Sequence, residues 1–327
     1  MRSIKLPSWT ERLLGLDPRP VPPHVFSLER RELLYGRFVR GESGYDVEDF
    51  VGVELPAGLF AAGPLGGPMH DAGLFKPLVH ELVRGVRGSV AEASLVLPDA
   101  WLRLAFAEVD ELPSRGARRD EVLRWKLRRQ VPFRVEDLRL RGVEVAPLPA
   151  QQEKHRVLLG FGIDQLLRQV EEAFASCGVR LGQVLNASLA SVDSVREVVG
   201  DVDLAALVLV AADGYSLTFT RRGEPLLHRF RALDTETGGD TVARLVLRDL
   251  KLTGTFLGDQ LPDSELGRVL LVCQPARARF WLDSLERGLG HRAVALGREQ
   301  LPLQGRLPDA SAAVLAPMLG AVRREVA

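Results

Sequence analysis

The chain has 327 residues, and its 43 Lys+Arg are balanced by 43 Asp+Glu, so its formal net charge is zero. This balance excludes a chain that is basic throughout, as nucleic-acid-binding proteins often are, and it excludes a strongly acidic tail. Apolar residues make up 46% of the chain, an ordinary value for a globular protein, but the length exceeds what one hydrophobic core usually fills. We therefore expect two lobes or domains.

Cysteine usage and the absence of long apolar stretches point to the cytoplasm. Cys177 and Cys273 lie far apart without partner spacing, so they predict neither a disulfide framework nor a zinc site. The first 25 residues lack the order of regions that marks a secretory signal. No stretch approaches the roughly 20 apolar residues that a spanning helix needs. We expect a cytoplasmic protein that does not cross a membrane by itself.

The beginning of the chain predicts a strand meander followed by a helix and a strand. Short apolar runs over 24–28, 32–39 and 50–55 are typical of three antiparallel strands. A helix over 72–86 and a buried strand over 93–97 come next. The apolar stripe that we expect on this helix consists of Leu74, Leu78, Leu82 and Val86.

Residues 98–178 predict a β-α-β-β-α unit. Its strands are expected over 101–109, 138–145 and 155–163. The first helix is expected over 118–130, ending before Pro132 because the residue before a proline resists helical angles. We expect its inward side chains to be Val122, Trp125 and Leu127. The second helix should begin at Asp164 as N-cap and end near Gly178, with an apolar stripe of Leu166, Val170 and Phe174.

The second half repeats the opening pattern. After a short helix over 186–198, three strands are expected, linked by Asp213-Gly214 and Gly223-Glu224 turns. The predicted strands are 204–212, 215–221, 225–231, 269–274 and 293–296, and the predicted helices are 239–252, 278–288 and 310–323. A duplicated β-β-β-α-β unit outlines an α/β protein with a two-lobed, actin-like (ribonuclease H-like) fold, here with an inserted α+β subdomain.

Signatures of catalysis are missing from the sequence. No glycine precedes a lysine, so there is no phosphate-binding P-loop, and no Gly-x-Ser-x-Gly motif is present. The six histidines share neither a face nor a ligand spacing. The sequence therefore predicts no catalytic residue and no metal site.

Two glycine turns could contact a nucleotide. Asp213-Gly214 is either a tight hairpin turn, which we favour, or a turn that presents N–H groups and a carboxylate to a magnesium nucleotide. Gly238-Gly239-Asp240 precedes a helix, and a helix N-terminus suits phosphate. A plain, flexible helix start explains the second turn equally well.

The zero net charge conceals a basic segment. Between 115 and 134 eight cations meet only Asp120 and Glu121, and the net charge is −3 for 1–110, +5 for 111–160 and −2 for the rest. A solvated helix face is the commonest explanation. A membrane-proximal or partner-binding surface is the next, and nucleic acid is disfavoured because no recognised nucleic-acid module surrounds the segment.

The order of several short motifs resembles the PilM family, actin-like type IV pilus assembly proteins of the bacterial inner-membrane platform. The resemblance covers almost the whole chain, from about 21 to 324. The motifs that carry it, weak singly but specific in their order, are Leu97-Pro98-Asp99, Val109-Asp110-Glu111-Leu112-Pro113, the helix 121–129, Val131-Pro132-Phe133, the strand 157–162, Cys177-Gly178-Val179, the segment 186–190 and Thr237-Gly238-Gly239-Asp240.

The chain departs from the family pattern in its nucleotide-binding segments. The first phosphate turn lacks its carboxylate and glycine and contains Glu29-Arg30-Arg31 instead. The second reads Ala211-Ala212-Asp213, and the adenosine turn reads Cys273-Gln274-Pro275. Because phosphate clamps and a placed metal supply much of the catalytic power of such enzymes, we expect a pseudo-ATPase scaffold without nucleotide turnover. ATP and magnesium are disfavoured as cofactors. If a nucleotide-binding remnant exists, it consists of Asp213, Gly214, Gly238, Gly239 and Asp240.

The resemblance also implies a domain layout and a partner. It divides the chain into an N-terminal segment (1–21), a first lobe (22–97 with 179–200), an inserted subdomain (98–178) and a second lobe (201–327). In the family, the cleft between the first lobe and the insert takes the cytoplasmic tail of the membrane protein PilN. We expect a PilN-like tail to bind beside Trp125, Arg129 and Phe133.

These implications predict a cytoplasmic scaffold that is peripheral to the inner membrane through its partner and that meets other pilus or secretion platform proteins. Whether copies of the chain form a homo-oligomer stays open. Two alternatives remain. One is an ATPase of the same assembly that uses Asp213 and Asp240, and the other is a soluble counterpart of the cytoplasmic part of the type II secretion protein GspL.

Overall fold

The computed structural model describes residues 21–61, 67–114, 116–131, 134–148, 151–233, 239–305 and 310–323. Two of its sheets have the same strand order. The first sheet runs β14-β3-β2-β1-β4-β8 and the second runs β11-β10-β9-β12-β13. In each sheet an antiparallel meander of three strands is followed by two parallel strands beside its first member. The predicted duplication is confirmed, and the short strand β14 is added at the outer edge of the first sheet.

The strands of the first sheet are β1 (His24–Leu28), β2 (Glu32–Arg40), β3 (Tyr45–Glu54), β4 (Glu92–Leu97), β8 (Arg180–Asn186) and β14 (Leu303–Gln304). Those of the second are β9 (Leu204–Val210), β10 (Gly214–Arg221), β11 (Glu224–Ala232), β12 (Leu266–Val272) and β13 (Ala293–Ala295). The helices are α2 (Ala72–Gly85), α3 (Ala117–Arg128), α4 (Asp164–Ala175), α5 (Ala187–Ser194), α6 (Arg196–Gly200), α7 (Gly239–Gln260), α8 (Ala278–Leu289) and α9 (Ala312–Arg323).

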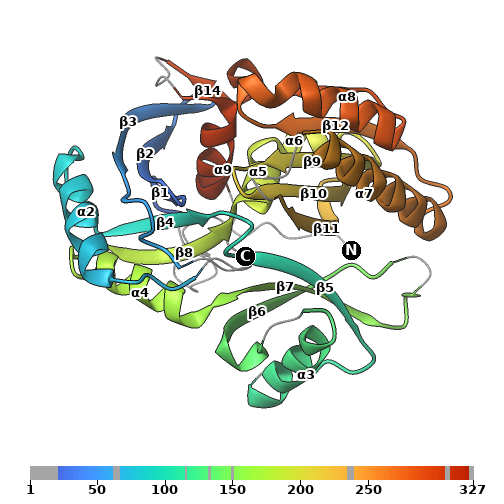
Figure 1. Ribbon diagram of the computed structural model, residues 1–327, viewed down its shortest axis with the longest axis horizontal. Coiled ribbons are helices and arrows are strands. Elements are labelled where there is room, and N and C mark those ends of the chain that lie inside the picture. The colour runs from blue at the N-terminus through green and yellow to red at the C-terminus, as the bar shows by residue number, and fades with distance from the viewer. Residues whose placement is uncertain are drawn as a thin grey trace, which may run out of the picture.

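Helices and sheets alternate in layers (Figure 1). Helices α2 and α4 cover the outer face of the first sheet, α5 and α9 lie between the two sheets, and α7 and α8 cover the outer face of the second sheet. The position of strand β9 between two cores explains why its sequence is continuously apolar. Its odd-numbered residues, such as Leu207, join the central core, whereas its even-numbered residues, such as Val208, pack under α7 and α8. A strand that is buried on both faces needs apolar side chains at every position.

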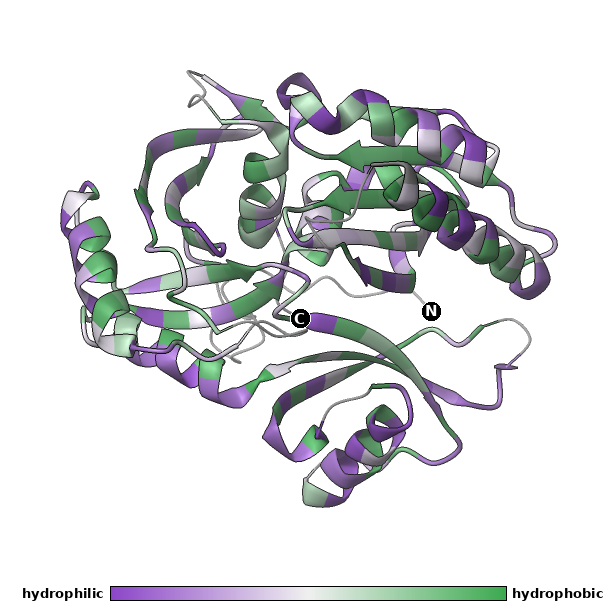
Figure 2. Cartoon of the chain, in the orientation of Figure 1, coloured by the Kyte–Doolittle hydropathy of each residue, from purple (hydrophilic) through white to green (hydrophobic). Residues whose placement is uncertain are grey.

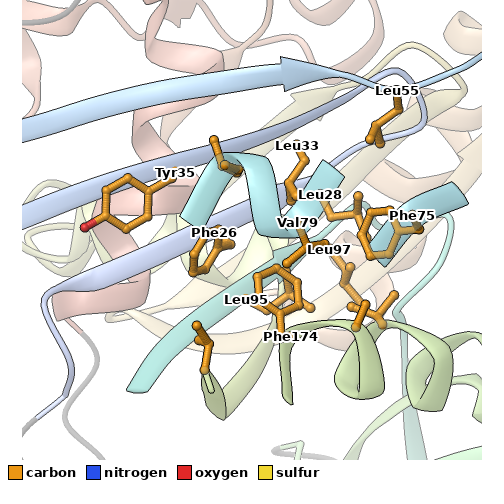
Figure 3. Packing of buried hydrophobic residues seen from close by; sticks show 14 of the residues in the cluster. Phe26, Leu28, Leu33, Tyr35, Leu55, Phe75, Val79, Leu95, Leu97 and Phe174 are labelled. Carbon is orange, nitrogen blue, oxygen red and sulfur yellow. The ribbon is translucent and has the colours of Figure 1, made fainter. Parts of the chain in front are cut away.

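The core under α2 and α4 is rich in aromatic side chains (Figure 3). Phe26 on β1 meets the ring of Phe174 on α4 with centroids 4.7 Å apart. Phe75 and Val79 approach the same core from α2. The contact joins the meander to the helix that returns from the inserted unit.

Small residues bring α5 and α9 together in the central layer. The side chains of α5 are almost all buried, and most of them are alanine or serine. Gly320 on α9 lies so close to α5 that an added Cβ would be 1.6 Å from the carbonyl oxygen of Ala190. The two helices can pack at this distance only because no side chain separates them.

The inserted unit has its own sheet and core. Strands β5 (Arg103–Val109), β7 (His155–Ile163) and β6 (Leu138–Val145) form an antiparallel sheet in the order β5-β7-β6. One face of this sheet packs on Leu123 and Leu127 of α3. Much of α3 is hydrophilic, whereas the central strands of the second sheet are hydrophobic (Figure 2).

Several details differ from the sequence-based expectations. On α2 the buried side chains are Phe75, Val79 and Leu82, and Val86 at the end of the helix is also buried, while Leu74 is 54% exposed. The expected stripe is therefore confirmed at Leu82 and Val86 and wrong at Leu74. Trp125 is 51% exposed rather than inward. Asp164 does not cap α4 but lies in its first turn.

Two strands were missed and one helix was underestimated. β8 and β14 were not expected, and α7 continues to Gln260, well beyond the predicted end at 252. Among the described residues no helix is both long enough and apolar enough to cross a membrane. The domain boundaries inferred from the resemblance remain a prediction.

Candidate functional site: an interlobe cavity and a groove beside it

A cavity of about 500 Å³ lies between the two lobes. It is lined by side chains from the end of β1, the segment after β4, the turn between β9 and β10, and the segment after β12. These elements bring together Glu29, Ala211, Ala212 and Gln274, which belong to the three segments that depart from the family pattern. Residues scattered over most of the chain thus line one cavity.

The carboxylate of Asp99 connects the lobes at this cavity. Asp99 follows β4 and is only 4% exposed. It accepts hydrogen bonds from the backbone N–H of Ser188 on α5 at 3.0 Å, from the Ser188 hydroxyl and from the Ser216 hydroxyl on β10. A buried carboxylate needs such donors because its desolvation is otherwise costly. The hydrogen bond from Ser216 reaches across to the second lobe, whereas the two from Ser188 remain on the side of the first lobe.

A further carboxyl group, that of Glu29, lines the cavity, and Asp213 lies between the lining residues Ala212 and Gly214. Burial raises the pKa of Glu29 to about 7, and the charges of Glu32 and Asp213 add to the effect. Burial also raises the pKa of Asp213, against the opposing charges of Arg30 and Arg103. The part of the cavity near Glu29 therefore disfavours additional negative charge.

The residues of this cavity do not fit a magnesium nucleotide. The Glu29 carboxyl lines the cavity, whereas phosphate groups are bound by cations and backbone N–H groups. Arg277, which also lines the cavity, already donates to the carbonyl oxygen of Ala211 at 2.9 Å. Within the described residues no three Asp, Glu, His or Cys side chains gather closely enough to hold a metal ion.

The Asp213-Gly214 turn joins β9 to β10, as the favoured hairpin interpretation requires. The Ala211 N–H donates to the Gly214 carbonyl oxygen at 2.9 Å, and the Leu233 N–H donates to the Asp213 carbonyl oxygen at 3.0 Å. A Cβ on Gly214 would be 2.3 Å from the carbonyl oxygen of Arg231. Glycine is needed here for a close backbone approach.

The second glycine turn is only partly described. Gly238 lies outside the described residues, and Gly239 and Asp240 form the first turn of α7. Nucleotide contact at these positions stays a prediction.

A second space, of about 320 Å³, lies between the first lobe and the inserted unit. Strand β8 and α5 form one wall, with Val184, Leu185, Asn186 and Leu189. The opposite wall is formed by the inserted sheet, and its lining side chains include Leu104, Arg141, Val143 and Leu158. We call this space the groove.

The groove is mostly apolar and is bounded by an open strand edge. β8 is the last strand of the first sheet, and β6 is a terminal strand of the inserted sheet. The side-chain amide of Asn186 donates to the Leu102 carbonyl oxygen at 2.6 Å and joins the two walls. Arg139 forms salt bridges with Asp164 at 2.7 Å and Glu171 at 2.5 Å, whereas Arg141 forms no salt bridge to a described residue. A strand edge beside apolar side chains can receive an extended peptide.

The structure brings Trp125 and Arg129 together, but away from the groove. The Arg129 guanidinium carbon lies 5.1 Å from the centre of the Trp125 ring. Both residues are on α3, which packs on the face of the inserted sheet opposite to the groove. Phe133 lies outside the described residues.

Sequence reasoning missed the groove residues for an identifiable reason. On β7, Val157, Leu159 and Phe161 face α3, and Leu158 and Gly160 face the groove. The available signal of a second buried face was Leu158, an apolar residue on the side of β7 that faces away from α3. It was uninformative without β8, because a single strand does not reveal what covers its other face.

This geometry is that of a two-lobed, actin-like α/β fold with an inserted subdomain, as the sequence predicts. The comparison with solved structures is more specific. A chain of the "PilM-PilN type IV pilus biogenesis complex" aligns with a TM-score of 0.71 and 16% identity, over 94% of this chain and 98% of that one. The PilM-like fold inferred from the motifs is confirmed.

A second neighbour belongs to a related system. The cytoplasmic domain of EpsL, an inner-membrane component of the type II secretion system of Vibrio cholerae, aligns with a TM-score of 0.50 and 12% identity, over 92% of this chain and 94% of that one. No protein-family profile matches the sequence, and no curated protein matches it. At these identities the comparisons establish the fold.

Proposed function

We propose that the protein is a cytoplasmic scaffold of a type IV pilus or related secretion platform and that it holds the cytoplasmic tail of a PilN-like membrane protein in the groove. The observation that carries the proposal is the apolar groove between the first lobe and the inserted unit. The likeness in fold to a chain from a complex with PilN supports the same partner. Through that partner the protein is peripheral to the inner membrane.

The groove sets requirements for the tail. Its width between β8 and β6 suits an extended segment that adds main-chain hydrogen bonds to a strand edge. Its lining suits apolar side chains, and Arg141 at the rim offers a charge to an acidic side chain or a terminal carboxylate. Affinity should therefore depend on apolar burial more than on salt concentration.

A peptide titration tests this arrangement. Val143 lines the groove and is 55% exposed, so Val143→Arg should fold normally and lower the affinity for a PilN-like tail peptide at least tenfold. Val294→Arg is the matched control, because Val294 is an exposed strand residue on the second lobe. Equal affinity of the Val143→Arg variant and the wild type would refute binding in the groove.

The contact predicted at Trp125, Arg129 and Phe133 is the competing position for the tail. A Trp125→Ala, Arg129→Glu double variant separates the two positions. If it abolishes peptide binding while Val143→Arg does not, the tail lies on α3. If it binds the peptide like the wild type, the groove position stands.

We further propose that the protein does not turn over ATP. The proposal rests on the Glu29 carboxyl in the cavity and on its raised pKa. Titration of the pure protein with magnesium ATP should show neither binding nor phosphate release. Phosphate release that is lost in an Asp213→Asn variant would instead favour the ATPase alternative, with Asp213 and Asp240 in the role of the missing carboxylates.

The fold likeness to the EpsL cytoplasmic domain supports the type II secretion alternative, which predicts the same lack of turnover.

A further inference from the structure

The outward side of α3 combines an exposed aromatic ring with basic side chains. Trp125 is 51% exposed, and its ring lies 5.3 Å from the Lys126 amino group and 5.1 Å from the Arg129 guanidinium carbon. Arg118 is exposed and lies two turns before Trp125 on the same side of the helix. We call Arg118, Trp125, Lys126 and Arg129 the α3 face.

The other described cations between 116 and 134 have structural partners. Arg119 donates to the Pro113 carbonyl oxygen at 3.1 Å, Arg124 donates to the carbonyl oxygens of Val135 and Leu138, and Arg128 pairs with Glu136. Across the described part of the chain, Arg118, Lys126 and Arg129 form no salt bridge. The charges that remain available are therefore concentrated beside Trp125.

One acid opposes them. Glu121 is exposed and lies one turn before Trp125 on the helix. With three unpaired cations and one carboxylate, the α3 face carries a net positive charge. The inserted sheet packs on the other side of the helix through Leu123 and Leu127, so this face points away from the protein.

We propose that the α3 face docks on the surface of an anionic lipid bilayer. A half-exposed tryptophan flanked by basic side chains is suited to the boundary between headgroups and acyl chains, where the indole is amphipathic and the cations meet lipid phosphates. The convex side of a single helix can contact an extended surface. The groove, which is concave and apolar, lies on the opposite face of the inserted sheet, so lipid contact leaves it free for a tail.

The expected strength follows from the number of charges. Each basic side chain near an anionic surface strengthens binding about fivefold. Replacing both arginines in an Arg118→Gln, Arg129→Gln double variant should weaken vesicle binding by about 25-fold. Glu121→Gln removes the opposing charge and should strengthen binding by roughly fivefold.

The experiment uses the full chain and vesicles without any peptide. Sedimentation with vesicles of phosphatidylcholine containing phosphatidylglycerol is compared with sedimentation with phosphatidylcholine alone, at low and high salt. Arg287→Gln is the matched control, since Arg287 is an exposed cation on α8 of the other lobe. Thermal unfolding verifies that each variant is folded.

The proposal predicts binding to the anionic vesicles only, loss of binding at high salt or in the double variant, a gain in Glu121→Gln and no change in Arg287→Gln. It is overturned if the wild type does not bind anionic vesicles, if the double variant binds them as strongly as the wild type does, or if Arg287→Gln weakens binding as much as the double variant does. Stronger binding to an RNA oligonucleotide than to the vesicles, lost in the same double variant, would also overturn it. None of these results depends on the groove, so failure here leaves the proposed tail binding to its own test.

Discussion

Replacement of Gly320 by alanine sets two physical effects against each other. Gly320 lies within α9, where alanine is favoured over glycine by about 1 kcal/mol of helix propensity. The added Cβ, however, would lie 1.6 Å from the Ala190 carbonyl oxygen and 2.5 Å from its carbonyl carbon. The sign of the stability change shows which effect dominates.

The geometry makes steric overlap the larger effect. To restore an ordinary van der Waals distance, α5 and α9 must separate by roughly 2 Å. Both helices are packed between the two sheets, so the whole central core has to follow. Overpacking of this kind costs about 1–3 kcal/mol or more, and we expect Gly320→Ala to lower the free energy of unfolding by about 2 kcal/mol after the propensity gain is included.

Urea and thermal unfolding followed by circular dichroism measure this change. At about 2.1 cal/mol/K per residue, the entropy of unfolding of this 327-residue chain is about 0.7 kcal/mol/K, so the Tm should fall by about 3 °C. Gly254→Ala on α7 is the matched control because no atom lies within 4 Å of its added Cβ. That variant should be slightly more stable than the wild type, by up to about 1 kcal/mol. A Gly320→Ala protein as stable as the wild type would refute the close packing of α5 and α9.

Three other substitutions test the cavity. Gly214→Ala should destabilise the protein by about 1–3 kcal/mol in urea unfolding, because its Cβ would be 2.3 Å from the Arg231 carbonyl oxygen. Asp99→Ala should cost about 3 kcal/mol in the same assay, since it leaves buried donors on Ser188 and Ser216 without an acceptor. The pKa of Glu29 is raised from 4.5 to about 7, so the unfolded chain releases this proton first and the wild type loses stability as pH rises through this interval. Glu29→Gln should therefore be more stable than the wild type at pH 8, by about 3 kcal/mol, and equal to it near pH 4 in thermal unfolding scans. A gap that is as large at pH 4 as at pH 8 would contradict the raised pKa.

The duplication could be predicted from the sequence because it rests on local patterns. The run over 204–210 is apolar at every position, and the turn at Asp213-Gly214 separates it from the next strand. These features act over a few residues and need no knowledge of the neighbouring element. The same reasoning located β1 and β7 at their observed bounds.

Helix faces were harder to predict because the partner decides them. On α2 the series of Leu74 and Leu78 and the series of Phe75 and Val79 have the same spacing, and contact with α4 and the first sheet selects the second. Trp125 was expected inside because it is large and apolar. Leu123, Leu127 and the partly buried Val122 pack over the inserted sheet, and the tryptophan remains outside.

The missed groove had a different cause. β8 contains Gly182 and Gln183 and has weak strand propensity, and its pairing with β4 joins segments almost ninety residues apart in sequence. Its existence therefore depends on a contact that local patterns do not encode. Without β8, one wall of the groove could not be anticipated.

Helix α5 forms part of the wall of both spaces. Ala187 lines the interlobe cavity, and Leu189, two residues later, lines the groove. Gly320 allows α9 to pack closely against this short helix. A ligand in the cavity and a peptide in the groove would thus contact the same helix, and any effect of one on the affinity of the other would be reciprocal.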